Sequence, residues 1–163
     1  MQRLLIRQIL SGLLEYLHRS IQPANGENMS RQIFVNLPVK DLKKSMAFFT
    51  SLGYKFNPQF TDERAACLVI SENIYFMLLL EQVFNTFTPK RIIDTSAEVE
   101  VINCLMVESR KEVDEQVDKA FKAGAKKSRD PEDLGFMYSR SFEDLDGHIW
   151  EVGYMDPNHI VTT

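Results

Sequence analysis

The chain has 163 residues, of which 44% are apolar and 26% are charged, and its formal net charge is −4. These values fit one globular domain, or two small repeats around one core, and they exclude a chain that is disordered throughout. The basic residues are scattered rather than gathered in one run, so we expect no nucleic-acid partner.

Residues 1–28 differ in character from the rest of the chain. Leucine and isoleucine recur at helical spacing over residues 4–17, before a polar linker, which predicts an amphipathic helix. Arg7 and Glu15 interrupt the apolar run, which disfavours a secretory signal and a membrane span. Two interpretations stay open. The helix docks on a partner subunit or a membrane surface, or the protein starts at Met29 and the preceding residues come from an over-assigned start.

The globular domain is expected at residues 29–163, and its first repeat at about 32–80. Apolar residues alternate over residues 33–39, which predicts a strand with one buried face. A helix is expected at residues 42–51, with Asp41 as its N-cap and Gly53 ending it. Short strands are then expected at about residues 54–59, 65–71 and 74–80.

The second repeat, at about 99–156, has the same order of elements. A strand at 99–107 precedes a helix at 110–123, which Ser109 caps and Gly124 ends. Weak strand signal at 125–129 and strands at 136–143 and 149–154 complete it. Two tandem βαβββ modules of the α+β class are the prediction, since each module alone is too small to close a core. The segment between them, residues 81–96, is either a binding loop or lid, or a simple crossover.

One residue of the last strand breaks its apolar pattern. The stretch FEDLDGHIWEVGYMD reads as a tight turn at Asp-Leu-Asp-Gly followed by a half-buried strand, and Glu151 lies within that strand between Trp150 and Val152. A carboxylate at this position either points to solvent or is placed in a site.

Two motifs resemble a known family. The stretch VKDLKKS, with the aromatic-bearing helix and the LGY that follow it, resembles the opening of the vicinal oxygen chelate superfamily, the glyoxalase, bleomycin-resistance and extradiol-dioxygenase group. The stretch FEDLDGHIWE is similar to the closing signature of that group. The resemblance covers residues 32–156. It implies paired modules whose strands form an open barrel-like sheet around a cavity, with a divalent metal in the metalloenzyme members, and it implies a homodimer.

The resemblance places one metal ligand in this chain, Glu151. The positions of the other ligands hold Phe34 on the first strand and Ile102 on the fifth, and neither side chain can bind a cation. We therefore expect no cofactor. A divalent metal stays an alternative, with a ligand set completed by a partner chain or by Glu81 and His159.

Strand parity predicts which residues line the cavity. If the turn that joins the last two strands has an even number of residues, Tyr138 and Arg140 lie on the same face of the sheet as Glu151. Arg140 would then be the cross-strand neighbour of Glu151, either in a structural salt bridge or as an anchor for a ligand. The same parity turns Phe34 and Asn36 inward. The expected ligand-binding residues are Phe34, Asn36, Met77, Ile102, Cys104, Tyr138, Arg140 and Glu151. A filled hydrophobic core would have the same composition.

The two cysteines, Cys67 and Cys104, lie in apolar runs without a paired spacing. This indicates small core residues in a reducing compartment, and hence a cytoplasmic protein, rather than a zinc site or disulfide. Cys104 as a nucleophile is an alternative to a quiet buried thiol, although no neighbouring histidine would activate it.

The sequence thus predicts a vicinal-oxygen-chelate-like protein that binds a small organic molecule without a complete metal site. One alternative is a metal-dependent lyase or isomerase of the glyoxalase type, or a dioxygenase-related enzyme, with Glu151 as metal ligand and catalytic base. Others are a non-catalytic drug-sequestering protein and an interaction module. The expected partners are a small-molecule ligand and a second copy of the chain, and neither nucleic acid nor a membrane.

Overall fold

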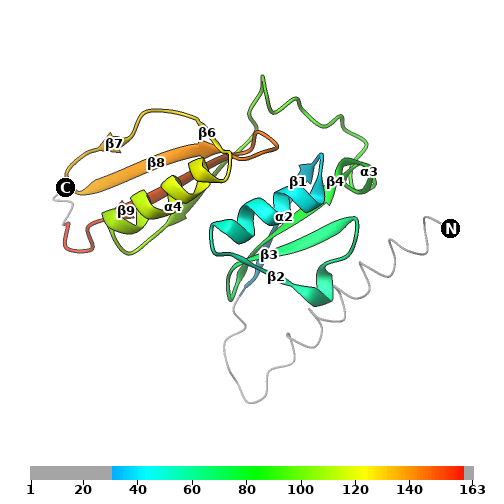
Figure 1. Cartoon of the computed structure of the whole chain (residues 1–163), viewed down its shortest axis with the longest axis horizontal. Helices are drawn as coiled ribbons and strands as arrows, with labels where there is room; N and C mark the ends of the chain where they lie inside the picture. Colours follow the sequence, from blue (N-terminus) through cyan, green and yellow to red (C-terminus); the bar gives the residue numbers. More distant parts are fainter. Residues whose placement is uncertain (1–30, 160–163) are drawn as a thin grey trace, which may run out of the picture.

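The computed structural model describes residues 31–159, which form two βαβββ modules (Figure 1). The first module consists of β1 (Ile33–Val39), α2 (Leu42–Ser51), β2 (Lys55–Asn57), the short 3-10 helix η1 (Pro58–Phe60), β3 (Ala65–Ser71) and β4 (Ile74–Leu80). A short helix, α3 (Glu81–Phe84), begins the crossover. The second module consists of β5 (Ile102–Met106), α4 (Arg110–Lys122), β6 (Lys126–Lys127), β7 (Glu132–Asp133), β8 (Met137–Glu143) and β9 (Ile149–Met155). The helix predicted within residues 1–28 lies outside the described residues.

The two long helices begin and end where the sequence predicts. The Asp41 carboxylate accepts a hydrogen bond from Lys44 N at 3.1 Å, and Ser109 Oγ accepts one from Glu112 N at 3.2 Å. Both bonds satisfy first-turn donors that have no partner within the helix. Shortly after each helix a glycine turns the chain with a φ of 103°. The helix-capping residues predicted for both repeats are therefore confirmed.

The strands form two mixed sheets and no closed barrel. The first sheet has the order β1-β4-β3-β2 and the second β5-β9-β8-β6, with β7 paired to β8. In each sheet the first strand of the module lies parallel to the last, while the remaining pairs are antiparallel. The α+β class and the tandem modules are confirmed. Several details differ from the expectation. β5 starts at residue 102 rather than 99, and the crossover opens with α3. The strand expected at 54–59 is shorter and continues into η1, and β7 is an additional strand.

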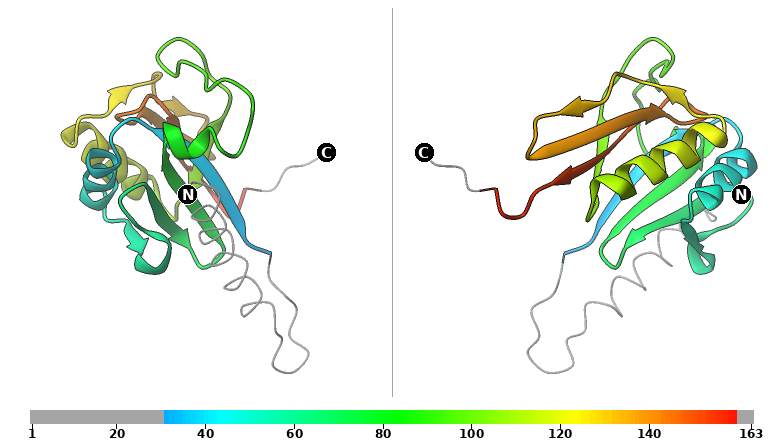
Figure 2. Two further views of the ribbon diagram at one scale, coloured as in Figure 1. Left: turned by 90° about the vertical axis from the view of Figure 1, so that its right-hand side faces the viewer. Right: turned by 60° about the vertical axis from the view of Figure 1, so that its left-hand side comes forward.

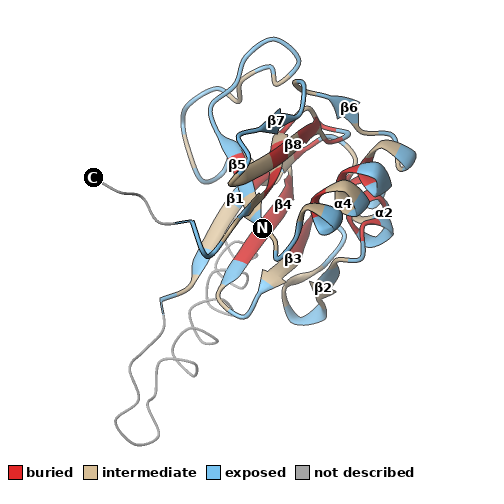
Figure 3. Ribbon diagram, turned by 90° about the vertical axis from the view of Figure 1, so that its left-hand side faces the viewer, coloured by how far each residue is buried: buried red, intermediate tan, exposed pale blue. Residues whose placement is uncertain are grey.

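The modules share one hydrophobic core between their helix-bearing faces. The Trp150 ring of β9 lies 5.2 Å from the Phe49 ring of α2 and 4.8 Å from the Phe76 ring of β4. Figure 2 shows α2 and α4 side by side, and Figure 3 shows the buried residues gathered between the sheets and these helices. Val113 and Val117 of α4 belong to the same cluster, so each module closes the core of the other. None of the helices within residues 31–159 is long and apolar enough to cross a membrane.

The turn between β8 and β9 fastens the second module to the first. Asp146 Oδ1 accepts a hydrogen bond from Lys40 N at 2.8 Å, and its Oδ2 accepts one from Ser45 Oγ at 2.6 Å. The imidazole of His148 donates from Nε2 to the carbonyl oxygen of Pro38 at 2.7 Å. The side chains of Asp146 and His148 thus hold the end of β1 and the start of α2, which are more than 100 residues away in the sequence.

A second carboxylate holds this turn together from within. Asp144 accepts hydrogen bonds from the backbone N–H groups of Asp146 and His148, at 2.9 and 3.0 Å, and from Trp150 Nε1 at 2.9 Å. Burial raises the pKa of Asp144, and the neighbouring His148 and the hydrogen bonds oppose that rise. The Asp-x-Asp-Gly-His motif is therefore a structural joint in this chain.

Candidate functional site

Glu151 lies on β9, on the face of the second sheet that points away from α4. Its register partners are Cys104 on β5 and Ser141 on β8. Trp150 and Val152, its neighbours in sequence, point into the shared core, as the period-2 pattern predicts. We call this side of the second sheet, with Ile102, Cys104, Met106, Ser139, Ser141 and Glu151, the Glu151 face.

Arg140 lies on the opposite face, so its predicted pairing with Glu151 is wrong. Glu143 is in register with Ile149, which leaves five residues in the connection, and this odd number reverses the parity that an even turn would give. Arg140 instead forms ion pairs with Asp114 and Asp118 of α4, at 2.8 and 2.9 Å.

Tyr138 is displaced from the expected cavity for the same reason. Its hydroxyl donates to Asp114 Oδ1 at 2.8 Å, beneath α4. Both of these predicted ligand-binding residues therefore hold the helix against the sheet, and the structure does not bring them to Glu151.

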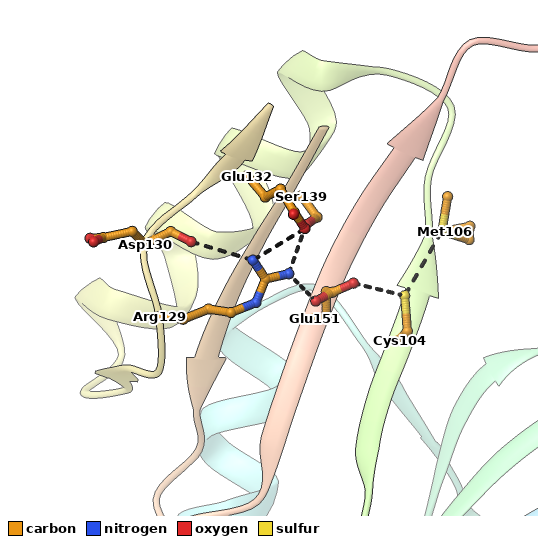
Figure 4. Close-up of polar contacts among 7 residues, drawn as sticks. All are labelled: Cys104, Met106, Arg129, Asp130, Glu132, Ser139 and Glu151. Atoms are coloured by element: carbon orange, nitrogen blue, oxygen red, sulfur yellow. Dashed lines mark hydrogen bonds and ion pairs between the residues drawn. The ribbon is translucent and has the colours of Figure 1, made fainter. Parts of the chain in front are cut away.

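The partner of Glu151 is Arg129, from the loop after β6 (Figure 4). Its Nη2 forms an ion pair with Glu151 Oε2 and donates to Ser139 Oγ at 2.9 Å. The hydrogen bond to Glu151 raises the pKa of Arg129. The Arg129 side chain is 38% exposed and that of Glu151 is 21% exposed, so both are within reach of a ligand. Only weak strand signal surrounds this arginine, which is why the sequence does not point to it.

The second carboxylate oxygen of Glu151 has a thiol beside it. Cys104 Sγ lies 3.6 Å from Glu151 Oε1 and 3.9 Å from Met106 Sδ (Figure 4). Burial raises the pKa of Cys104, and the charge of Glu151 raises it further. The protonated thiol is thus favoured, and it is a poor nucleophile. Cys67 is buried in the core as predicted, whereas Cys104 is exposed, which corrects the expectation of a core position.

The edge strand of the Glu151 face is apolar, whereas its inner strand β8 carries buried hydroxyl groups. Ile102 and Met106 on the edge strand β5 are 55% and 57% exposed. On strand β8, which neighbours β9, Ser139 and Ser141 are buried, and Ser141 Oγ makes no hydrogen bond with any residue of the described range. A buried hydroxyl without a partner is uncommon in native proteins, so this one calls for an explanation.

The first-module residues that were predicted to line the cavity lie on the other sheet. Phe34 stacks on Tyr75 with ring centroids 4.7 Å apart, and Met77 belongs to the same apolar cluster on the face away from α2. Asn36 is in register with Met77 and is exposed. The structure therefore divides the predicted set between two sheets.

The described residues do not fit the divalent metal that the family resemblance implies. Within residues 31–159 no group of three or more His, Cys, Asp and Glu side chains is placed to hold a metal ion. The carboxylate of Glu151 is already engaged by Arg129 and Cys104, and His159 stacks on Phe136 with ring centroids 4.0 Å apart. Glu81 lines a separate cleft.

Comparisons with known proteins agree with the fold. Residues 31–71 match the family "Bleomycin resistance protein-like N-terminal", and no curated protein matches the chain. A hypothetical protein from S. aureus, SA1046, is 29% identical, with a TM-score of 0.65 over 78% of this chain and 95% of that one. A glyoxalase/bleomycin resistance protein/dioxygenase family enzyme from Burkholderia phytofirmans PsJN is 14% identical, with a TM-score of 0.66 over 77% and 99%. The fosfomycin resistance protein FosX from Listeria monocytogenes is 19% identical, with a TM-score of 0.56 over 83% and 97%.

Proposed function

We propose that this chain, which has the fold of the vicinal oxygen chelate superfamily, binds a small organic molecule on the Glu151 face without a divalent metal. The observation that carries this proposal is the Arg129–Glu151 ion pair together with the buried, unpartnered hydroxyl of Ser141, the register partner of Glu151 on β8. An ion pair that served stability alone would contribute about 0–1 kcal/mol at this exposure, and it would not account for an unsatisfied buried hydroxyl on the adjacent strand.

The arrangement favours a ligand with a paired donor and acceptor group on an apolar body. A carboxamide or a urea can accept from the Arg129 guanidinium and donate to Glu151 in the same plane. The apolar body would cover Ile102 and Met106, which are exposed beside the pair. A polar group of the ligand that entered beside Glu151 would also form a hydrogen bond with the Ser141 hydroxyl. Binding sites of small molecules commonly combine apolar walls with a few polar anchors in this way.

A thermal-shift screen of carboxamides, ureas and hydroxy acids tests this proposal, with hits confirmed by calorimetric titration. We expect Arg129→Gln and Glu151→Gln each to weaken a confirmed hit by about tenfold or more, which is about 1.4 kcal/mol of binding free energy. Arg140→Gln is the matched control, since it removes an arginine from the hairpin that carries Glu151 but from its opposite face. Equal loss in all three variants, or no hit at all, would overturn the proposal.

A second copy of the chain is the partner we propose for the exposed sheet edges. β1 and β5 are edge strands of their sheets, and Ile33 and Ile102, the first residue of each, are more than half exposed. An exposed edge strand presents unpaired backbone N–H and C=O groups that can pair with a strand of another chain. Light scattering at a series of concentrations is expected to give twice the chain mass, and a monomer at all concentrations would contradict it. A cytoplasmic location belongs to the same proposal.

A further inference from the structure

A cleft of about 520 Å³ opens at the junction of the modules, away from the Glu151 face. It is bounded by the end of β1, by α3, by residues 91–95 of the crossover and by the turn before β9. Its polar lining comes from Lys40, Glu81, Asn85, Arg91, Asp94, Thr95 and Asp146. Its volume is within the range of small-molecule sites.

The walls of this cleft are fixed by specific contacts. Thr95 Oγ1 donates to the carbonyl oxygen of Asp146, and Asp146 in turn accepts from Lys40 N at 2.8 Å. Gly147 permits the close approach of the crossover, because a Cβ at that position would lie 2.9 Å from Thr95 Oγ1. The crossover and the end of β1 are thus fastened to the same turn, and the cleft between them is a built feature of the fold.

Four polar side chains of the cleft form no hydrogen bond or ion pair with any described residue, whereas the carboxylates of Asp94 and Asp146 are hydrogen-bonded. Lys40 and Arg91 form no ion pair and no side-chain hydrogen bond within residues 31–159, and the same holds for the Glu81 carboxylate and the Asn85 amide. Hydrogen bonds from Ser96 hold the pKa of Asp94 below its usual range, and the charges of Lys40 and Arg91 lower it further. Both cations therefore act on the same part of the cleft.

We propose that this cleft binds a small zwitterion of about the size of a dipeptide. The carboxylate of the ligand would pair with Lys40 and Arg91, and its ammonium group with Glu81 and the Asn85 amide oxygen. The side chains of Ile92 and Ile93, which are half-buried in the lining, would contact its apolar part. A simple anion fits less well, because Glu81 and Asp94 carry negative charge in the same lining.

The test uses the full chain and three related compounds. These are the dipeptide Leu-Leu, its N-acetyl derivative, which lacks the ammonium group, and its amide, which lacks the carboxylate. In calorimetric titrations we expect Leu-Leu to bind saturably and each derivative to bind about tenfold or more weakly, because each loses one charged contact. Saturable binding of the N-acetyl derivative alone would show an anion site and overturn the proposal, and so would silence of all three compounds.

Charge-removing variants then locate the site. Lys40→Gln and Arg91→Gln are expected to abolish the preference for Leu-Leu over its amide, and Glu81→Gln the preference for Leu-Leu over its N-acetyl derivative. Lys40→Gln keeps the backbone donor to Asp146, so the joint is preserved. Lys90→Gln is the matched control, because it removes the neighbouring exposed cation, which does not line the cleft. Unchanged selectivity in the three cleft variants would place the binding elsewhere and overturn the proposal.

Discussion

Two parts of one sequence stretch use their polar groups in opposite ways. At the Asp144–His148 turn, buried carboxylates have all their oxygens bonded to donors from both modules. Three residues further on, the Glu151 face has a partly exposed ion pair and, on the adjacent strand, a buried hydroxyl that lacks a partner among the described residues. Complete satisfaction indicates a structural role, since nothing is left for a ligand to bind, whereas incomplete satisfaction beside an accessible charge pair indicates a binding role.

The largest effect on stability is expected from Asp144→Ala. This change leaves three buried donors without an acceptor, and each such donor costs roughly 1–3 kcal/mol. We expect the free energy of unfolding to fall by about 3 kcal/mol or more in urea denaturation. A loss of less than about 1 kcal/mol would show that the turn is not the joint described here.

Gly147→Ala tests the close approach of the crossover to the same turn. The added Cβ would lie 2.9 to 3.1 Å from atoms of Thr95, and the φ of 89° is itself unfavourable for alanine. Gly135→Ala is the matched control, because Gly135 has a φ of 80° and nothing within 4 Å of an added Cβ. Both variants bear the backbone strain of about 1–2 kcal/mol, and we expect Gly147→Ala to lose more in urea denaturation. Equal losses of unfolding free energy in the two variants would show that contact with Thr95 does not restrict residue 147.

Ser141→Ala tests whether the unpartnered hydroxyl of the Glu151 face contributes to stability. Because the hydroxyl is buried without a partner, we expect its removal to leave stability unchanged or to raise it by about 1 kcal/mol. The same variant is expected to weaken a ligand of the Glu151 face in calorimetric titration. A stability loss of more than about 1 kcal/mol would mean that Ser141 has a structural bond after all.

The pH dependence of stability is expected to differ in sign between a buried and an exposed carboxyl. Hydrogen bonding to Arg110 lowers the pKa of Asp133 from 3.8 to about 2, so its contribution is present above pH 3.8 and is lost as the pH falls towards about 2. The raised pKa of Asp144 acts oppositely, since its contribution is lost as the pH rises through the folded-state value. Asp133→Asn is expected to flatten the small acid-side decline in urea midpoints, and an unchanged decline would contradict this assignment.

The sequence predicted the elements of the fold because their signals are local. Asp41, Ser109 and the glycines after each helix set the helix bounds within a residue or two. Of the predicted buried face of β1, Val35, Leu37 and Val39 pack in the shared core, whereas Ile33 at the start of the strand is 53% exposed. The tandem repeat followed from comparing those signals between the halves.

The contacts of the site could not be predicted, because they depend on features without a sequence pattern. The parity of the β8–β9 hairpin depends on whether its connection has an even or an odd length, and the motif alone does not decide this. Arg129 reaches Glu151 from a loop, where no periodicity places side chains. The cleft at the module junction arises only when the crossover folds against the turn.

The most direct test of the central claim is calorimetric titration of a confirmed ligand of the Glu151 face in excess EDTA. The account predicts that the native chain binds with the same affinity with and without the chelator, and that Arg129→Gln weakens binding by about tenfold or more in both. Loss of binding in EDTA, with recovery on adding nickel, zinc or manganese, would contradict it and establish a metal site at Glu151.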